Sequence, residues 1–183
     1  MTPATILRDP AAKARPAVAC ESFRMNIDIA IARSVDIVAP RARLAKLLAD
    51  LESTIGRFPK LKRLKKLAEN QYLWEMAPIG SRMANISHEV SYGADYSVDA
   101  KRGAVSWKPI AGKGNATIEG EFRLEEVGAK TRLHFRVGGR LRDVPVPLLY
   151  RVVAPAFIQG KFTRLVDVFL ERTAEAAMEG ATA

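Results

Sequence analysis

The feature that most constrains this chain is the alternation of apolar and polar residues that runs, with short interruptions, through residues 71–141. A period of two is typical of β-strands that bury one face and expose the other. Glycine-containing turns separate the runs, and such short connections favour antiparallel neighbours. Residues 85–98 alternate without a break and predict one continuous strand. The region therefore predicts an antiparallel sheet with a single apolar face.

Elements of two other kinds flank this region. Residues 25–38 also alternate and predict a first strand, and Pro40 can open a short helix that ends by Gly56. Residues 148–178 carry apolar side chains at helical spacing, which predicts a long amphipathic helix that Pro155 either kinks or begins. We therefore predict an α+β fold in which about seven curved antiparallel strands enclose the C-terminal helix, with a short helical segment after strand one.

Length and composition fit one domain with one core. The chain has 183 residues, of which 48% are hydrophobic. We expect a flexible tail over residues 1–24, a single domain over 25–178 and a frayed end over 179–183; translation can begin at Met1 or at Met25. The single cysteine, Cys20, cannot form an intramolecular disulfide. The tail lacks the apolar core of a secretory signal, so the sequence predicts a cytoplasmic protein, either free or at a membrane surface.

Five segments carry a resemblance to a known superfamily: RSVDIVAPRARLAKLLADLE, FPKLKRLKKL, YLWEM, VSWKPI and FTRLVDVFLERT. On these segments, residues 25–178 resemble the SRPBCC superfamily. This is the helix-grip fold of birch-pollen-allergen-like proteins, START lipid-transfer domains, polyketide cyclase/dehydrase-like proteins and proteins similar to an accessory subunit of carbon monoxide dehydrogenase. The resemblance implies a cavity between the concave sheet and the long helix. It also implies that residues 57–67 form a loop leading into the second strand.

The alternation within the strands and the helical spacing of residues 148–178 predict which side chains line the implied cavity. Large aromatic side chains with polar tips suit a mostly apolar ligand that a few hydrogen bonds orient. The same stripes could equally fill a core that holds no ligand. The predicted ligand-binding residues are Tyr72, Trp74, Met76, His88, Tyr92, Tyr96, Trp107, Phe122, Ile158, Phe162, Val166 and Phe169.

Four residues are candidates for catalysis: His88, Tyr92, Tyr96 and Arg33. His88 shares the apolar parity of its strand, and its reference pKa near 6.5 suits proton transfer, although a packed histidine fits the same pattern. Arg33 falls on the inward parity of the first strand, where it could bind an oxyanion. A bulge after Ile31, or a position at the end of the sheet, would instead bring Arg33 to solvent. Gln159 is a minor candidate of the same kind.

Motifs for metal, nucleotide or hydrolase chemistry do not occur. His134 falls on the polar parity of its strand, away from His88, so we expect no metal site. Gly112 and Gly114 lack the third glycine of a dinucleotide fingerprint. Neither G-x-S-x-G nor H-E-x-x-H is present. We therefore expect no cofactor.

A basic segment concentrates the positive charge. Its six cations are Arg57, Lys60, Lys62, Arg63, Lys65 and Lys66, and without them the net charge falls from +9 to +3. The segment could be a solvated face, or it could dock on an anionic membrane, where each cation contributes roughly 1 kcal/mol, or on an acidic protein. Nucleic acid is the least favoured partner because Phe58 is the only stacking aromatic in the segment.

These observations favour a protein that binds or transports a hydrophobic small molecule or lipid in an internal cavity. One alternative is a polyketide cyclase- or dehydratase-like enzyme. Another is an accessory protein for the assembly of a cofactor or a membrane complex. The sequence leaves ligand identity, catalysis and oligomeric state open.

Overall fold

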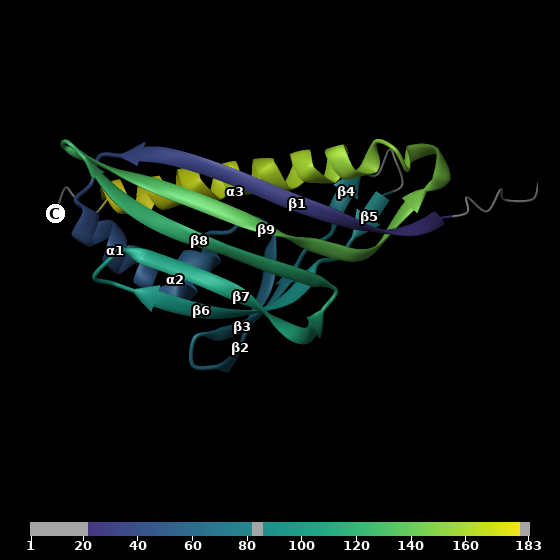
Figure 1. Cartoon of the computed structure of the whole chain (residues 1–183), viewed down its shortest axis with the longest axis horizontal. Helices are drawn as coiled ribbons and strands as arrows, with labels where there is room; N and C mark the ends of the chain where they lie inside the picture. Colours follow the sequence, from purple (N-terminus) through teal and green to yellow (C-terminus); the bar gives the residue numbers. More distant parts are fainter. Residues whose placement is uncertain (1–21, 82–85, 180–183) are drawn as a thin grey trace, which may run out of the picture.

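A seven-stranded antiparallel sheet curves around one long helix (Figure 1). The computed structural model describes residues 22–81 and 86–179, so Cys20 and most of the predicted tail lie outside the described residues. The sheet order is β1-β9-β8-β7-β6-β3-β2, and β4 pairs with β5 separately. The elements are β1 (Ser22–Ile37), α1 (Arg41–Ala49), α2 (Leu51–Gly56), β2 (Leu61–Ala68), β3 (Gln71–Met76), β4 (Ile79–Ser81), β5 (Ile86–His88), β6 (Ser91–Asp99), β7 (Ala104–Gly114), β8 (Ala116–Val127), β9 (Lys130–Pro147), a 3-10 turn (Leu148–Tyr150) and α3 (Ala154–Glu179). This arrangement confirms the predicted α+β fold.

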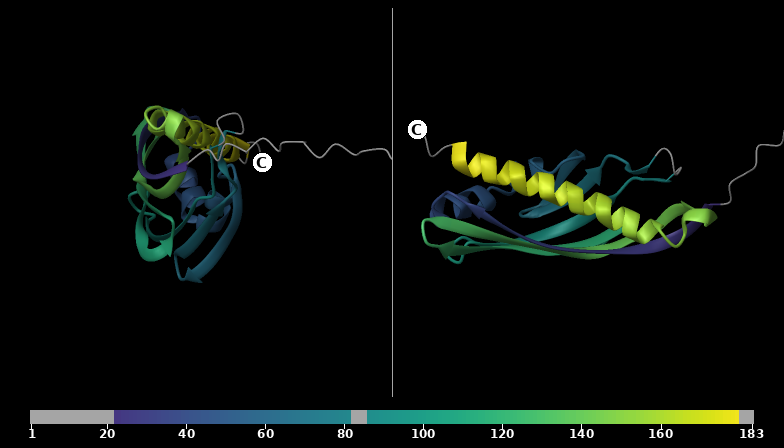
Figure 2. Two further views of the ribbon diagram at one scale, coloured as in Figure 1. Left: turned by 90° about the vertical axis from the view of Figure 1, so that its right-hand side faces the viewer. Right: turned by 90° about the horizontal axis from the view of Figure 1, so that it is seen from above.

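The concave face of the sheet is apolar and packs against α3 (Figure 2). Along α3, buried side chains recur at helical spacing from Ile158 to Phe169. On the opposite face of the sheet, alternation places charged residues that pair across β1 and β9. Asp28 pairs with Arg140, and Asp36 pairs with Arg132, each at 2.6 Å. Within the described residues, no helix is long and apolar enough to cross a membrane.

The edge strand β1 is covered by a side chain of α3. The Ala30 N–H donates to Oε1 of Gln159 at 3.2 Å, and Nε2 of Gln159 donates to the Ala30 carbonyl at 2.7 Å. The amide thus forms the pair of hydrogen bonds that a neighbouring strand would form. Gln159, a minor ligand candidate from the sequence, has a structural role at the edge of the sheet.

The basic segment contains an edge strand, so the loop that the resemblance implied is wrong. Leu61 pairs with Met76 and Leu64 pairs with Trp74, while the register shifts between residues 61 and 63 and again between 66 and 68. Each bulge adds one residue and reverses the parity of the residues after it. Two bulges therefore convert the usual period of two into the leucine spacing of three that obscured this strand in the sequence.

Three further boundaries differ from the prediction. The single strand expected over residues 85–98 is divided into β5, which pairs with β4, and β6. Strand β1 begins at Ser22 rather than Met25. The C-terminal helix begins at Ala154, so Pro155 lies in its first turn, where a missing N–H costs no helical hydrogen bond.

Gly120 in β8 allows the close approach of two neighbours. A Cβ at this position would collide with the backbone oxygen of Arg136 and with the indole ring of Trp107. We expect Gly120→Ala to lower the free energy of unfolding by about 1–3 kcal/mol through overpacking. Gly160, in α3, has open space at its Cβ position, so Gly160→Ala should raise stability by about 0.5–1 kcal/mol. Urea denaturation of both variants measures these changes; equal effects would contradict the packing argument.

Candidate functional site

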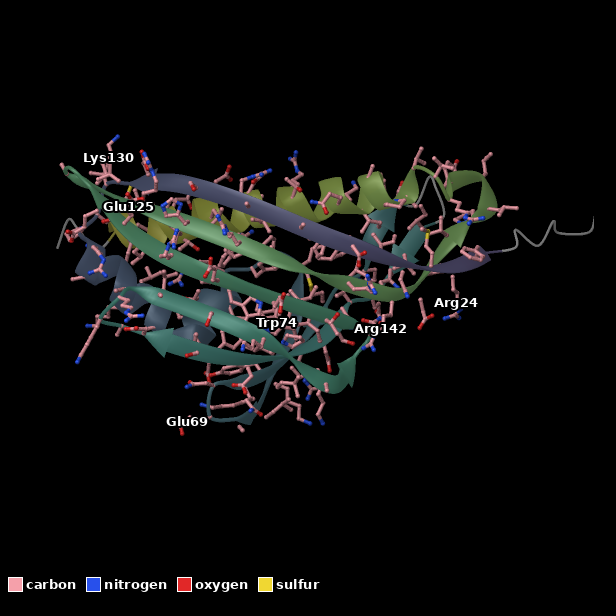
Figure 3. The ribbon with its side chains drawn as sticks, in the orientation of Figure 1. Arg24, Glu69, Trp74, Glu125, Lys130 and Arg142 are labelled. Carbon is pink, nitrogen blue, oxygen red and sulfur yellow. The ribbon has the colours of Figure 1, made fainter. Side chains whose placement is uncertain are left out.

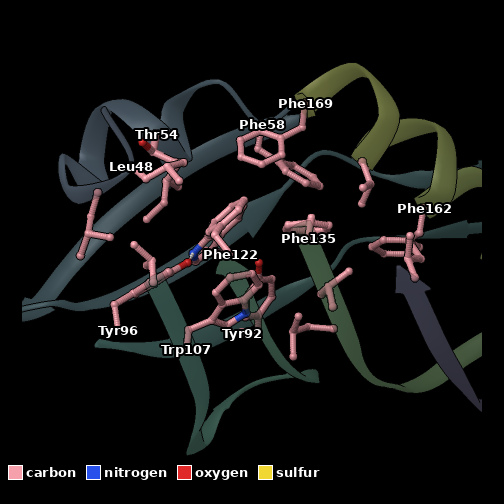
Figure 4. A pocket seen from close by; sticks show the side chains of 18 of the residues that line it. Leu48, Thr54, Phe58, Tyr92, Tyr96, Trp107, Phe122, Phe135, Phe162 and Phe169 are labelled. Atoms are coloured by element: carbon pink, nitrogen blue, oxygen red, sulfur yellow. Dashed lines mark hydrogen bonds between the residues drawn. The ribbon is translucent and has the colours of Figure 1, made fainter. Parts of the chain in front are cut away.

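A cavity of about 50 Å³ lies between the concave sheet and the three helices (Figure 4). Strands β3, β6, β7 and β8 supply aromatic rings from one side, and α3 supplies Phe162, Val166 and Phe169 from the other. The structure places nine of the predicted ligand-binding residues in the lining: Trp74, Met76, Tyr92, Tyr96, Trp107, Phe122, Phe162, Val166 and Phe169.

The other three predicted residues are buried outside the lining. The Tyr72 hydroxyl donates to Oε1 of Glu52, a residue of α2, at 3.3 Å. Ile158 packs in the core on α3, before the segment of the helix that reaches the cavity. His88 is on β5, which is not part of the main sheet. Parity correctly predicted burial of these residues but could not distinguish the cavity from the surrounding core.

Several lining residues were missed by the sequence analysis. Phe135 shares the inward parity of β9, so the alternation already contained its signal. Ile29 and Ile31 share the inward parity of β1 in the same way. Phe58 lies just before β2, in the segment interpreted as a loop, and its ring lies 5.4 Å from that of Phe169. The remaining missed residues come mainly from α1 and α2: Leu48, Leu51, Thr54, Ile55, Val105, Ile118 and Val137.

Aromatic rings form one continuous cluster along the cavity. The ring centroids of Phe122 and Phe169 are 5.9 Å apart, which joins the sheet to α3. Trp107 contacts Phe122 at 5.5 Å and Tyr96 at 5.7 Å. Tilted contacts of this length are favourable for aromatic pairs. The cluster gives the cavity rigid walls of polarisable rings.

Two polar groups at the cavity have no partner among the described residues. The Tyr92 hydroxyl forms no hydrogen bond with them, and neither does the buried Nε1 of Trp107. In contrast, Nε1 of Trp74 donates to the Tyr96 hydroxyl at 3.1 Å. A buried donor without a partner costs free energy, so an unpaired group of this kind is informative. Both groups can donate to a hydrogen-bond acceptor.

Burial keeps both cavity tyrosines protonated. It raises the pKa of Tyr92 well above its usual value, and it raises the pKa of Tyr96 as well, against a lowering effect of the Trp74 hydrogen bond. The lining contains no histidine, carboxylate, lysine, arginine or cysteine among the described residues. The cavity thus lacks a group that changes protonation near neutral pH.

His88 is packed away from this cavity. Its side chain is 8% exposed, and its Nε2 lies 3.4 Å from Nδ2 of Asn115. Burial lowers the pKa of His88, and the nearby Asp143 carboxylate opposes that effect. The histidine is therefore neutral at pH 7, but it is not positioned to act on a molecule in the cavity.

Arg33 keeps the inward parity of β1 but reaches solvent. The register of β1 with β9 is continuous here, and its shift lies between Met25 and Ile27, so the bulge considered after Ile31 is absent. Nε of Arg33 donates to Oδ1 of Asp167 on α3 at 2.8 Å, and the Arg33 side chain is 40% exposed. Of the four candidate catalytic residues, the structure brings only the two tyrosines to the cavity.

The second histidine lies on the opposite face of the sheet. His134 Nε2 is 2.9 Å from Oε2 of Glu125, and its Nδ1 is 2.9 Å from the Ser34 hydroxyl. Within the part of the chain that the structure describes, no group of three His, Cys, Asp or Glu side chains could hold a metal ion.

Comparison with known proteins gives a likeness in structure only. No protein-family model matches the chain, and no curated protein matches it in sequence. Among solved structures, the Zhui aromatase/cyclase from Streptomyces sp. R1128 has a TM-score of 0.57 at 12% identity, over 82% of this chain and 93% of that protein. A START superfamily protein from Mycobacterium smegmatis has a TM-score of 0.56 at 15% identity, over 80% and 97%. The chain has the START-like helix-grip fold.

A plant protein shares the fold as well. The ginseng major latex-like protein 151 from Panax ginseng has a TM-score of 0.53 at 9% identity, over 83% of this chain and 99% of that one. At these identities the likeness concerns the fold. It confirms the fold that the sequence resemblance implied.

Burial of His88 predicts a pH dependence of stability for this protein. Its folded pKa lies below the reference value near 6.5, so the unfolded chain binds the proton more readily. Stability should therefore fall as the pH drops below about 6.5, above the range where carboxylates titrate. Urea midpoints at pH 7 and pH 5 should show a smaller decline in His88→Gln, whereas His134→Gln, which keeps His88, should retain it. An unchanged decline in His88→Gln would contradict this assignment.

Proposed function

We propose that the protein binds a small hydrophobic molecule that carries a hydrogen-bond acceptor. The observation that supports this most is the aromatic cavity between the sheet and the helices, whose lining includes the Tyr92 hydroxyl and the tryptophan Trp107 with its buried, unpaired Nε1. An apolar ring system would replace water against the cavity walls, and its acceptor would satisfy one of the two donors. The START and aromatase/cyclase names of the structural neighbours fit small-molecule binding in this fold.

The size of the cavity favours a compact ligand. A single water needs roughly 10–15 Å³, so about 50 Å³ is more than one water requires. A cavity that binds benzene measures about 150 Å³, so even a single ring would require some wall side chains to move outward, and an acyl chain would require a larger displacement of α3. We therefore place a small ring compound ahead of a lipid as the ligand, and binding rather than transport as the function.

Catalysis is less well supported. A cyclase or dehydratase of the predicted kind needs a group that accepts a proton near neutral pH. Tyr92 and Tyr96 have raised pKa values, while His88 and Arg33 lie away from the cavity. Burial of the ligand, without covalent chemistry, is the mechanism that the residues at the cavity support best.

Docking of the basic strand β2 on an anionic membrane or an acidic protein stays a prediction. Its Lys62 and Lys66 lie 3.9 and 3.5 Å from the carboxylates of Glu89 and Glu52. Leu61 and Leu64 pack against the core rather than projecting outward. Lysines on an edge strand also prevent a second chain from pairing with that strand. The positive charge of β2 therefore has a function even if it docks on nothing.

Tyr92→Phe provides the test of ligand binding. Acetophenone and ethylbenzene have similar shapes, but only acetophenone carries an acceptor. We expect the wild-type protein to prefer acetophenone by about two- to tenfold in ligand-detected NMR titrations, as one hydrogen bond would give. Tyr92→Phe should remove this preference while leaving ethylbenzene binding unchanged.

Two matched variants control for indirect effects. Tyr72→Phe removes a hydroxyl that bonds to Glu52 outside the cavity, so it should keep the preference. Val137→Phe should fill part of the cavity and weaken both compounds, because Val137 lines it and is only half-buried. Failure of both compounds to bind the wild-type protein would sink the proposal, as would equal binding of the two. An undiminished preference in Tyr92→Phe would instead place the acceptor at Nε1 of Trp107.

A further inference from the structure

Five apolar side chains are exposed together at one end of the molecule. The segments that carry them, the start of β1 and the connection from β9 to α3, lie at the same end of the molecule in Figure 1. Strand pairing joins the two segments, since Phe23 pairs with Val146. We call this surface the apolar tip: Phe23, Leu148, Leu149, Val152 and Val153.

Two residues of the apolar tip are almost fully exposed. Leu149 is 85% exposed and Val152 is 89% exposed. Single exposed apolar residues are common, but neighbouring ones that form a patch indicate an interaction site. Val38, at the other end of β1, is 60% exposed without belonging to this cluster. Val38 is therefore a matched control for the cluster.

Positive charge outweighs negative charge next to the apolar tip, where Asp143 precedes a segment without acidic residues. No Asp or Glu occurs in residues 144–166, whereas Arg151, Lys161 and Arg164 do. The guanidinium carbon of Arg151 lies 5.1 Å from the centroid of the Phe23 ring, so a cation is held directly over the patch. Figure 3 shows Arg24 at the same end. At the surface of an anionic bilayer, apolar side chains can contact the acyl chains while neighbouring arginines contact the negatively charged headgroups.

We propose that the apolar tip inserts into the surface of an anionic membrane, with the surrounding arginines contacting lipid phosphates. This surface differs from strand β2, where the cations accompany leucines that pack inward. The apolar tip combines charge with projecting apolar side chains, and interfacial binding uses both. Insertion of the apolar tip does not require a ligand in the cavity.

Charge disfavours two other occupants of this surface, a second copy of the chain and the first twenty-one residues of the same chain. A symmetric contact with a second copy would bring the Arg151 and Arg24 side chains of both copies together. The first twenty-one residues carry Arg8, Lys13 and Arg15 against Asp9 and Glu21, so they are also net positive. A bilayer rich in anionic lipid is the partner whose charge is complementary.

Vesicle binding of the full chain tests the proposal. We expect co-sedimentation with vesicles of phosphatidylcholine containing phosphatidylserine, and much less with phosphatidylcholine alone. The double variant Leu149→Asp/Val152→Asp should lower partitioning by about tenfold or more, because it removes both projecting side chains and adds negative charge. Val38→Asp is the matched control and should bind as the wild type does. A milder variant, Leu149→Ser/Val152→Ser, should give a smaller loss in the same direction.

Several outcomes would overturn the inference. These are absence of wild-type binding to anionic vesicles, an equal loss in Val38→Asp, and unchanged binding of the double aspartate variant. Loss of binding only when Lys62, Arg63 and Lys65 are reversed would assign docking to β2 instead. A wild-type dimer that the aspartate variant converts to monomer, without vesicle binding, would assign the surface to a second copy.

A fluorescence measurement adds a readout of insertion. Val152→Trp should show a blue-shifted emission on vesicle addition and quenching by lipids brominated in the acyl chain. Val38→Trp should show neither change, and the native Trp74 and Trp107 are buried in both variants. Quenching in Val38→Trp alone, or in neither variant, would contradict insertion of the apolar tip.

Discussion

The structure depends on covering the concave face of a one-sided sheet. Rings from β7, β8 and β9 point toward α3, where Phe169 contacts Phe58, Phe122 and Phe135 with centroid separations of 5.4, 5.9 and 6.1 Å. This one helical residue therefore meets rings from the segment before β2, from β8 and from β9. Because the opposite face is charged and solvated, no other surface of the sheet can supply an equivalent core. The cavity is the part of this interface that the side chains leave unfilled.

The alternation of apolar and polar residues correctly predicted the strands that pair in continuous register. Strands β8 and β9 pair in continuous register, so their parity in the sequence equals their parity in space. Strand β2 failed this condition because two bulges reversed its parity within eight residues. The position of a bulge depends on the partner strand, and a single strand's sequence does not contain that information.

The candidate site shows the same limit at the level of single side chains. Parity correctly turned Arg33 toward α3, but only the fold shows that Asp167 pairs with it at the edge of the sheet. Parity also predicted correctly that His88 is buried, but His88 lies on β5, which pairs with β4 and is not part of the main sheet. The hydrogen-bond states of Tyr92 and Tyr96 are equally invisible in the sequence, because they depend on which neighbour reaches each hydroxyl. Chemistry at the site is decided by these partners.

The amide of Gln159 has a consequence for how the helix is positioned. Apolar side chains alone would let α3 slide along the sheet, because one set of rings can replace another in similar contacts. The two hydrogen bonds to Ala30 form at one position only, and a shift by one helical turn of about 5.4 Å would break both. Gln159 therefore sets the axial register of α3 against the β1 backbone. It fixes which helical residues stand above the cavity, and so it sets the shape of the space that a ligand would enter.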